Sequence, residues 1–483
     1  MSFLSTAALR SLLSVPFPAA LLAGAICTLL LTTGCTEPSA RLPAPDWTPI
    51  APGLSDAGLR PPPWAGTRIP EPERPGWPVN ATLDDCIVFA MQNSPALETA
   101  FYRWRAAVEG VPQARSLPDP ELGFAIVLDQ VDRDTEYMGE RYSISQMFPW
   151  FGKLALRGDI ATEAARAEAR RYEAARLALI ERVTNAWFEY AWLQAAVTTA
   201  RENRELLLRL ESVARSMYRA GTVSQADVNR AQIELGRLDD QLRSMMDMLG
   251  PAAAELNAVL GRPAHAPLPT EPAAPSQQAV ADLPARDDEA WLALARQLNP
   301  ELAASRHAVA RERRSVELAR REYYPDIKLG LEYARDGSAR MARMDGGGAD
   351  MLVGGVSVNV PIRRSRYDAG VREASARLAE ASHQVHEQGN ALEAELKAAL
   401  FAYRDSQRKL QLYAGTLVPK ARQSLAVTEA AYRTAEAGFS DLIDTQRVLL
   451  EFQLAHERAA ADRAQARARI GALAGDPSTG LKP

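Results

Sequence analysis

The sequence predicts an α+β membrane protein in which each chain supplies four β-strands to a barrel and continues into very long helices. The chain contains two versions of one unit, at 82–261 and 287–475. Each unit has short alternating segments followed by a long helical stretch. Several landmarks recur at one constant spacing: Tyr218 with Tyr432, Asp227 with Asp441, Gln232 with Gln446, and Gly261 with Gly475. A repeat of this kind is one structural unit used twice, so both halves should have the same order of elements.

Alternating apolar residues predict the strands. In the first unit the alternation covers 121–131 and 142–148, and in the second it covers 327–333 and 352–360. Alternating segments of about ten residues are typical of transmembrane β-strands. The same pattern also fits soluble hairpins with one buried face, so the alternation by itself leaves both interpretations open.

The helices follow from the composition between the strands. Shorter helices are predicted near 83–92 and 95–116, and a much longer one from Lys153 to Ala220, a stretch without proline. At 1.5 Å per residue this helix would be ~100 Å long. The counterpart, Ser365 to Thr434, contains Pro419, which should kink or break it. Helices of this length need other helices beside them, which favours a coiled-coil-like helical barrel with an alanine-rich seam.

Closure of the sheet predicts the oligomeric state. An open sheet edge is not stable in lipid, and membrane barrels start at about eight strands. Four strands per chain are too few, whereas three chains would supply about twelve, so we expect a homotrimer with a 12-stranded barrel. After residue 35 no apolar run reaches the ~18–20 residues that a spanning helix requires.

The N-terminal region predicts export and anchoring. Residues 1–34 have the apolar run of a signal peptide, and small residues precede Cys35 as in bacterial lipoproteins. We expect lipidation of Cys35, followed by a proline-rich tether at 35–81 that retains the protein at outer-membrane lipid. An ordinary signal peptide with an incidental Cys35 is the alternative. A second proline-rich linker at 262–286 joins the repeats, and 476–483 is a short tail.

Composition and motifs argue against several other functions. A net charge of −4 is unfavourable for binding nucleic acid. The sequence has no G-x-S-x-G, H-E-x-x-H or phosphate-loop motif, so no enzyme activity is expected. His383 and His386 are spaced for one helix face beside Glu387, but two histidines without a third ligand fit a solvated face better than a metal site. Cys86 is expected to be packed in the core. We therefore predict no metal and no cofactor beyond the lipid on Cys35.

Three motifs carry a resemblance to a known family. They are Gln146–Lys153 where the second strand meets the long helix, Tyr218–Asp227 at the end of that helix, and Asp441–Arg447 at the equivalent place in the second unit. With these motifs, about 80–475 resembles the TolC family of outer-membrane efflux proteins, and most closely its heavy-metal subgroup serving pumps of the resistance-nodulation-division (RND) type. The resemblance implies a trimeric channel whose helix tips meet a periplasmic adaptor, which connects to an inner-membrane RND pump.

The resemblance also implies functional residues. Asp441 and Asp444 would form an acidic periplasmic gate, although acids in a first helical turn also simply favour the helix dipole. The adaptor-docking tip would comprise Arg219, Gly221, Thr222, Val223, Ser224, Asp227, Gly438 and Phe439. Gly221 would permit the positive φ of a tight turn, and Ser224 with Asp227 resembles a capping box, so this tip also has a purely structural interpretation. The second tip departs from the first, because Ala435 replaces the glycine.

Three functions remain open from the sequence. The first is a passive exit duct of a tripartite efflux system for metal cations or small organic toxicants. The second is the same duct serving type I protein secretion. The third is a soluble periplasmic coiled-coil scaffold, against which the four alternating strands argue.

Overall fold

The computed structural model describes the repeated part of the chain, and all described residues belong to one compact unit within Arg74–Pro483. The described residues are 81–126, 139–150, 152–268, 272–278, 280–336, 351–434 and 436–476. The predicted signal peptide, the lipidation site Cys35, the tether up to residue 80 and nearly all of the tail lie outside them.

In the described part of the first half there are four α-helices and two strands. In chain order these are α3 (Leu83–Asn93), α4 (Pro95–Arg115), β1 (Glu121–Ile126), β2 (Gly139–Phe148), α5 (Lys153–Arg219) and α6 (Gln225–Val259). A short 3₁₀ helix, η3 (Pro275–Gln277), lies in the linker.

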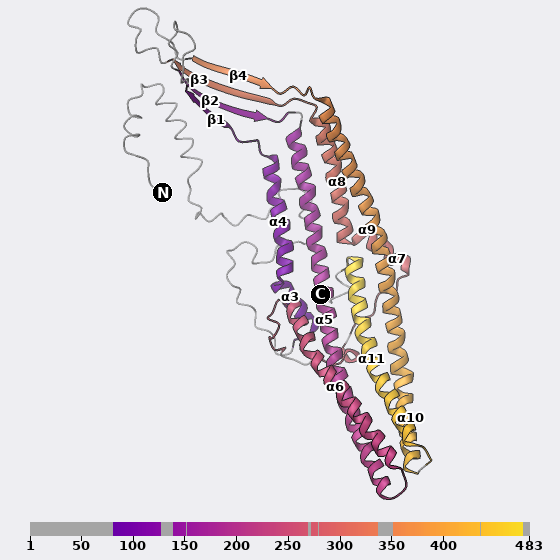
Figure 1. Ribbon diagram of the computed structural model, residues 1–483. Coiled ribbons are helices and arrows are strands. Elements are labelled where there is room, and N and C mark those ends of the chain that lie inside the picture. Colours follow the sequence, from indigo (N-terminus) through magenta and orange to yellow (C-terminus); the bar gives the residue numbers. More distant parts are fainter. Residues whose placement is uncertain are drawn as a thin grey trace, which may run out of the picture. The chain divides into compact units, whose positions relative to one another are not determined.

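The second half has the same order of elements, with one helix divided. Its elements are α7 (Asp288–Leu298), α8 (Pro300–Arg321), β3 (Ile327–Asp336), β4 (Met351–Val358), α9 (Arg364–Leu412), the π-helical turn η5 (Tyr413–Leu417), α10 (Val418–Arg433) and α11 (Phe439–Ala474). Each half thus opens with two helices before its strands (Figure 1).

Equivalent residues start the second helix of each half. The Ser94 side chain accepts a hydrogen bond from the Leu97 N–H, and the Asn299 side chain accepts one from the Leu302 N–H. Each of these capping residues is followed by a proline, whose missing N–H is harmless in the first helical turn.

Equivalent glycines close each half. Gly261 and Gly475, at the ends of α6 and α11, have φ of +72° and +71°. A β-carbon at Gly261 would lie 2.5 Å from the carbonyl oxygen of Asn93, and one at Gly475 would lie 2.4 Å from that of Leu298. The last helix of each half therefore ends directly against the junction between the first two helices, where only glycine fits.

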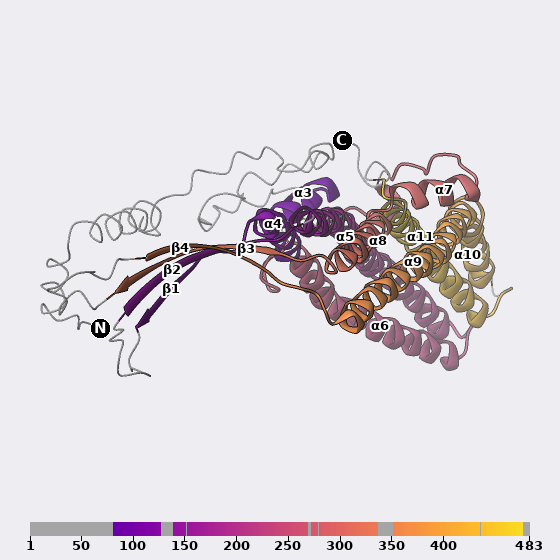
Figure 2. The ribbon, with the colours of Figure 1, turned by 90° about the horizontal axis from the view of Figure 1, so that it is seen from above.

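The four strands form one antiparallel sheet in the order β1-β2-β3-β4. The pairing of β2 with β3 joins the two halves, and Tyr142 lies opposite Tyr333 in this register. Among the described strands, β1 and β4 each have a neighbour on one side only. Figure 2 shows the four strands side by side, extending away from the helices.

The long helix α5 is the centre of the helical part. Its 67 residues span ~100 Å, close to the predicted length. It packs against α4, α6, α8 and α11, and the surfaces that α5 and α11 bury are rich in alanine, as predicted. Small side chains let the helix backbones approach closely.

Pro419 interrupts the counterpart of α5, as predicted. The π-helical turn Tyr413–Leu417 comes immediately before Val418 and Pro419, which begin α10. Proline has no N–H to donate to the preceding turn and its ring crowds that turn, so the backbone widens there. None of the described helices is both long enough and apolar enough to span a membrane.

Candidate functional site

The first candidate surface is the turn between α5 and α6. Gly221 has φ +76°, which confirms the predicted positive φ, and its N–H donates to the Tyr218 carbonyl at 2.9 Å. Thr222 closes the end of α5 by donating to the Met217 carbonyl from both its N–H, at 3.0 Å, and its hydroxyl, at 2.9 Å. The carboxylate of Asp227 then accepts bonds from the backbone N–H and hydroxyl of Ser224, in the capping box predicted for the start of α6.

The turn between α10 and α11 has a different geometry. The N–H groups of Glu436 and Ala437 both donate to the Ala431 carbonyl, at 2.8 and 3.2 Å. Gly438 caps α11 with φ −78° and donates its N–H to the Asp441 carboxylate at 3.1 Å. Ala435, where the two repeats differ, lies outside the described residues.

The predicted docking residues differ in how far they are exposed. Arg219, Gly221, Thr222, Ser224 and Gly438 are exposed, and Asp227 is half-buried. Val223 is only half-exposed and packs on the apolar core of the hairpins. Phe439 is buried, with 2% of its surface exposed.

The burial of Phe439 has a simple physical reason. Its ring lies 5.5 Å from that of Tyr432, edge to face, and the pair fills the space between the ends of α10 and α11. Phe439 therefore supports the second tip from inside and presents no ring to a partner. The Tyr432 hydroxyl is enclosed as well, and burial, with the nearby Asp227 charge, raises the pKa of Tyr432 to about 12.

The two predicted gate acids lie on an exposed part of α11. Asp441 is exposed, and its carboxylate accepts the Gly438 N–H, so this acid caps the start of α11. Asp444 has 70% of its side chain exposed and lies 3.3 Å from the guanidinium of Arg447. A capping role and a role as an exposed charge are compatible for the same acid.

An ion-pair network that the sequence did not predict joins the two hairpins. Arg447 on α11 donates to both carboxylate oxygens of Glu234 on α6, and Arg230 on α6 donates to the Ser440 hydroxyl on α11. Burial raises the pKa of Glu234, but the hydrogen bonds and positive charges of Arg447 and Arg237 outweigh it and hold the pKa below its ordinary value. The two residues of each pair are about 210 residues apart in the chain, so no local sequence pattern predicts these pairs.

A cavity lies beside this network. It has a volume of about 290 Å³ and lies between α5, α6 and α11. It is lined by Leu207, Glu234, Arg237, Leu238, Gln241, Gln446, Arg447, Leu450, Glu451 and Leu454. Gln446 also donates to Asn203 at 3.2 Å within the core, so the groove has a polar, hydrogen-bonded floor as well as leucines.

A buried lysine fastens the sheet to the helices. Lys153 begins α5 with only 1% of its side chain exposed, and its ammonium group lies 2.9 Å from the Asp326 carboxylate. The same group donates to the Tyr324 carbonyl at 2.8 Å. Asp326 also accepts the Trp150 N–H at 3.1 Å and donates its own N–H to the Asn359 side chain. The buried pair of Lys153 and Asp326 therefore links three connections between strand and helix: β2 to α5, α8 to β3, and β4 to α9.

The sheet has one apolar face and one polar face. Leu122, Phe124, Ile144, Leu331 and Val356 share the apolar face, and all are exposed.

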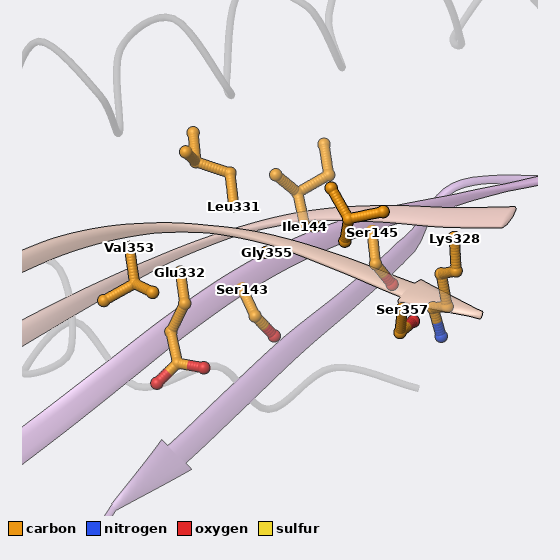
Figure 3. A pocket seen from close by; sticks show the side chains of 11 residues that line it. Ser143, Ile144, Ser145, Lys328, Leu331, Glu332, Val353, Gly355 and Ser357 are labelled. Atoms are coloured by element: carbon orange, nitrogen blue, oxygen red, sulfur yellow. The ribbon is translucent and has the colours of Figure 1, made fainter.

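The opposite face is polar and charged. It carries serines, glycines and two cross-strand ion pairs, Lys328 with Glu121 and Arg141 with Glu332. A depression of about 250 Å³ lies over β2, β3 and β4. Figure 3 shows Ser143, Glu332 and Ser357 on one side of the sheet and Ile144 and Leu331 on the other.

The described residues contain no assembled group of metal ligands. No group of three or more potential metal-ligating side chains occurs among them. His383 and His386 are exposed on α9, which fits the solvated helix face. Cys86 is fully buried, and burial raises the pKa of its thiol to about 12, as expected for a packing residue.

Several known proteins are similar to this chain in sequence or in fold. The chain is 27% identical to Protein CyaE of Bordetella pertussis over 66% of this chain and 68% of that protein. It is 23% identical to the cobalt-zinc-cadmium resistance protein CzcC of Cupriavidus metallidurans, over 77% of this chain and 85% of that protein. The outer membrane protein VceC of Vibrio cholerae has the same fold, with a TM-score of 0.69 and 20% identity over 82% of this chain and 96% of VceC.

The family assignment rests on a match to both halves of the chain. The model of the outer membrane efflux protein family matches residues 87–262 and again residues 291–476. These two segments contain nearly all of the helices and strands described above, including both helix tips and the complete sheet. The chain therefore belongs to the outer membrane efflux protein family.

Proposed function

We propose that this chain is the outer-membrane channel subunit of a tripartite efflux system. Three copies form a passive exit duct, anchored by lipid on Cys35. The duct docks a periplasmic adaptor through its helix tips, and an inner-membrane RND pump supplies the free energy. One observation carries the proposal: an exposed two-faced sheet continues through the buried Lys153 junction into a helix of ~100 Å, in a member of this family.

Closure of the sheet supports the trimer. The apolar face belongs in lipid, but β1 and β4 each have only one described neighbour. A backbone edge without hydrogen-bond partners is too unfavourable in a membrane, so β4 of one copy pairs with β1 of the next. Three copies of this four-stranded sheet close a barrel of about twelve strands, with the polar face towards the lumen. The apolar face also argues against the soluble scaffold.

The charges support a path for cations or small polar organic molecules. On the polar face each described ion pair joins one cation to one carboxylate, so this wall has no strong preference for either sign. Asp441 and Asp444 add exposed negative charge at the tips, and a ring of such acids attracts cations. Similarity to a cobalt-zinc-cadmium resistance protein supports metal cations as cargo.

Native mass spectrometry of the protein extracted from outer membranes tests the assembly. The expected species is a trimer whose chains begin at Cys35 and carry acyl chains. A monomer without lipid that stays soluble in the absence of detergent would overturn the duct and restore the scaffold. A trimer without acyl mass would remove only the lipid anchor.

Single-channel recording tests the gate. Asp441→Asn with Asp444→Asn removes both charges and keeps an oxygen to accept the Gly438 N–H, so the helix start is preserved. Block by a trivalent cation should weaken about tenfold or more, since two charges per chain are lost. Asp240→Asn with Asp247→Asn is the matched control, because both are exposed acids on α6 away from the tip. Equal block in all three proteins would refute the gate.

Substitution of Gly221 tests the docking tip. A β-carbon at Gly221 meets no atom within 4 Å, so Gly221→Trp adds a ring to the outer surface at the cost of positive-φ strain. A folded trimer that no longer confers resistance is expected. Gly221→Ala carries the same strain without the ring and should retain resistance, whereas Gly236→Trp places a ring on α6 away from the turn. Full resistance in Gly221→Trp cells would exclude this surface as the docking site.

Complementation of a deletion strain tests the cargo. Growth on graded zinc, cobalt and cadmium, and on dyes and detergents, should show a defect that the intact gene restores. Restored tolerance to metals alone assigns metal cations, and restored tolerance to the organic compounds alone assigns those. A strain that tolerates both but fails to release a protein into the medium would favour the secretion duct.

A further inference from the structure

The apolar face of the sheet continues beyond the ends of the strands. Trp150 follows β2, and Val360 and Ile362 follow β4; 47%, 72% and 79% of their surfaces are exposed. Val360 and Ile362 keep the alternation of Val356 and Val358. Large apolar side chains that stay exposed at successive alternate positions mark a surface that contacts something other than water.

Arginines lie immediately beyond this apolar band. Arg363, Arg364 and Arg366 occupy the start of α9, and all three are exposed. Arg366 lies 6.0 Å from the ring centre of Tyr367. None of the three arginines forms an ion pair with a carboxylate in the described part of the chain.

The end of α8 lies beside these residues and adds two more exposed arginines, Arg320 and Arg321. The rings of Tyr323 and Tyr367 are 5.5 Å apart, and the Tyr323 hydroxyl donates to Asp368.

The carboxylates of this region already have partners. Glu322 and Asp326 pair with Lys153, and Asp368 accepts the Tyr323 hydroxyl. Among the described residues, none of these carboxylates forms an ion pair with Arg363, Arg364 or Arg366.

Helix stability does not account for the arginines of α9. Positive charge at the end of a helix, as at Arg320 and Arg321, favours the helix dipole, but positive charge at the start of a helix opposes it. The first turn of α9 has no acidic residue. Arg363, Arg364 and Arg366 therefore stand where the helix alone would favour the opposite charge.

We propose that this junction surface, formed by Trp150, Val360, Ile362, Arg363, Arg364 and Arg366, binds the headgroups of anionic phospholipids. The order of side chains along the chain matches the order of layers in a bilayer. The apolar strand face lies among acyl chains, the exposed tryptophan lies at the boundary, and arginines follow at the depth of the phosphates. Guanidinium groups suit this ligand because each can donate two parallel hydrogen bonds to one phosphate.

The proposal rests on the proposed insertion of the sheet in a membrane, and its test separates the two. The full-length trimer is reconstituted into nanodiscs of phosphatidylcholine, with or without phosphatidylglycerol, and the lipids it retains after release are counted by native mass spectrometry. Arg363→Gln with Arg364→Gln and Arg366→Gln should lower the preference for phosphatidylglycerol by roughly fivefold per arginine, on the order of 100-fold for three.

The matched control is Arg209→Gln with Arg243→Gln and Arg422→Gln, which removes the same charge from exposed positions on α5, α6 and α10. This control should keep the preference for phosphatidylglycerol. An equal loss in both triple variants would overturn the proposal, because it would reflect net charge alone.

Three further outcomes are distinct. A junction variant that keeps its anionic lipids but dissociates into monomers assigns the arginines to carboxylates of a second copy, which also overturns the lipid site. If the unmodified protein does not insert into nanodiscs at all, the proposed duct fails. If it inserts and conducts ions but shows no preference for phosphatidylglycerol, only the lipid inference fails.

Discussion

Alanine substitution at the two closing glycines should be far more destabilising than at the tip glycine, although all have nearly the same backbone conformation. Gly261, Gly475 and Gly221 have φ of +72°, +71° and +76°. For alanine, this left-handed conformation costs about 1 kcal/mol or slightly more. Because a β-carbon at Gly221 meets nothing within 4 Å, Gly221→Ala should lower the free energy of unfolding by about that amount.

The other two positions add a collision with backbone. A β-carbon at Gly261 would lie 2.5 Å from the Asn93 oxygen. A β-carbon at Gly475 would lie 2.4 Å from the Leu298 oxygen and 2.7 Å from its carbon. A carbonyl held in a helix end cannot rotate away, so the helices must separate, which costs about 1–3 kcal/mol more. The expected total is roughly 2–4 kcal/mol for each, with Gly475→Ala the larger.

Denaturant unfolding of the detergent-solubilised protein, followed by circular dichroism, measures the series. Gly236→Ala is the control: this glycine lies inside α6 with open space around it, so alanine should stabilise the protein by up to about 1 kcal/mol. The expected order of stability places Gly236→Ala above the unmodified protein, then Gly221→Ala, and the two closing positions last. Equal effects at Gly221 and Gly261 would refute the argument, because the collision would then contribute nothing.

Three further predictions concern charged and titratable groups. Lys153→Met should lower the free energy of unfolding by about 3 kcal/mol, which is the lower end for breaking a buried ion pair, because Asp326 keeps some solvent contact. Adding Asp326→Asn to the same chain should restore part of the lost stability. An unchanged denaturation midpoint in Lys153→Met would contradict this. Because the pKa of Glu234 is lowered, its link to Arg447 is present above the unfolded pKa near 4.5 and is lost as the pH falls through the folded value. Glu234→Gln should therefore destabilise by about 1 kcal/mol at pH 7 and by progressively less as the pH falls below 4.5. A difference that stays constant as the pH is lowered would count against this. With a thiol pKa of about 12, Cys86 should resist iodoacetamide at neutral pH until the protein unfolds. Rapid alkylation of Cys86 in the folded protein, read by mass spectrometry, would exclude the buried thiol.

Local patterns were sufficient for most of the fold. Proline-free alanine-rich sequence predicts α5 from Lys153, and the structure starts the helix at that residue. Alternation predicts the strands because their side chains point to opposite faces in turn. The break at Pro419 and the positive φ at Gly221 follow from the chemistry of single residues, and both are confirmed.

The candidate site was less predictable, because exposure depends on partners elsewhere in the chain. Phe439 follows the second turn in sequence and was expected on the docking surface, but Tyr432 lies close enough in space to bury it. Val223 was expected to be exposed in the same way and instead packs partly on the hairpin core. The roles of the gate acids and of the docking tip stay predictions.

By itself, the sequence determined the elements of this protein and their repetition, since helix length, strand alternation, caps and turns depend on neighbouring residues. Only the tertiary structure decided which charges meet. Glu234 and Arg447 are 213 residues apart, and Lys153 at the start of α5 meets Asp326, which follows α6, α7 and α8 in the chain. Such pairs depend on the register in which whole helices pack against one another. Because that register is set by the summed contacts of many side chains, no single motif predicts it.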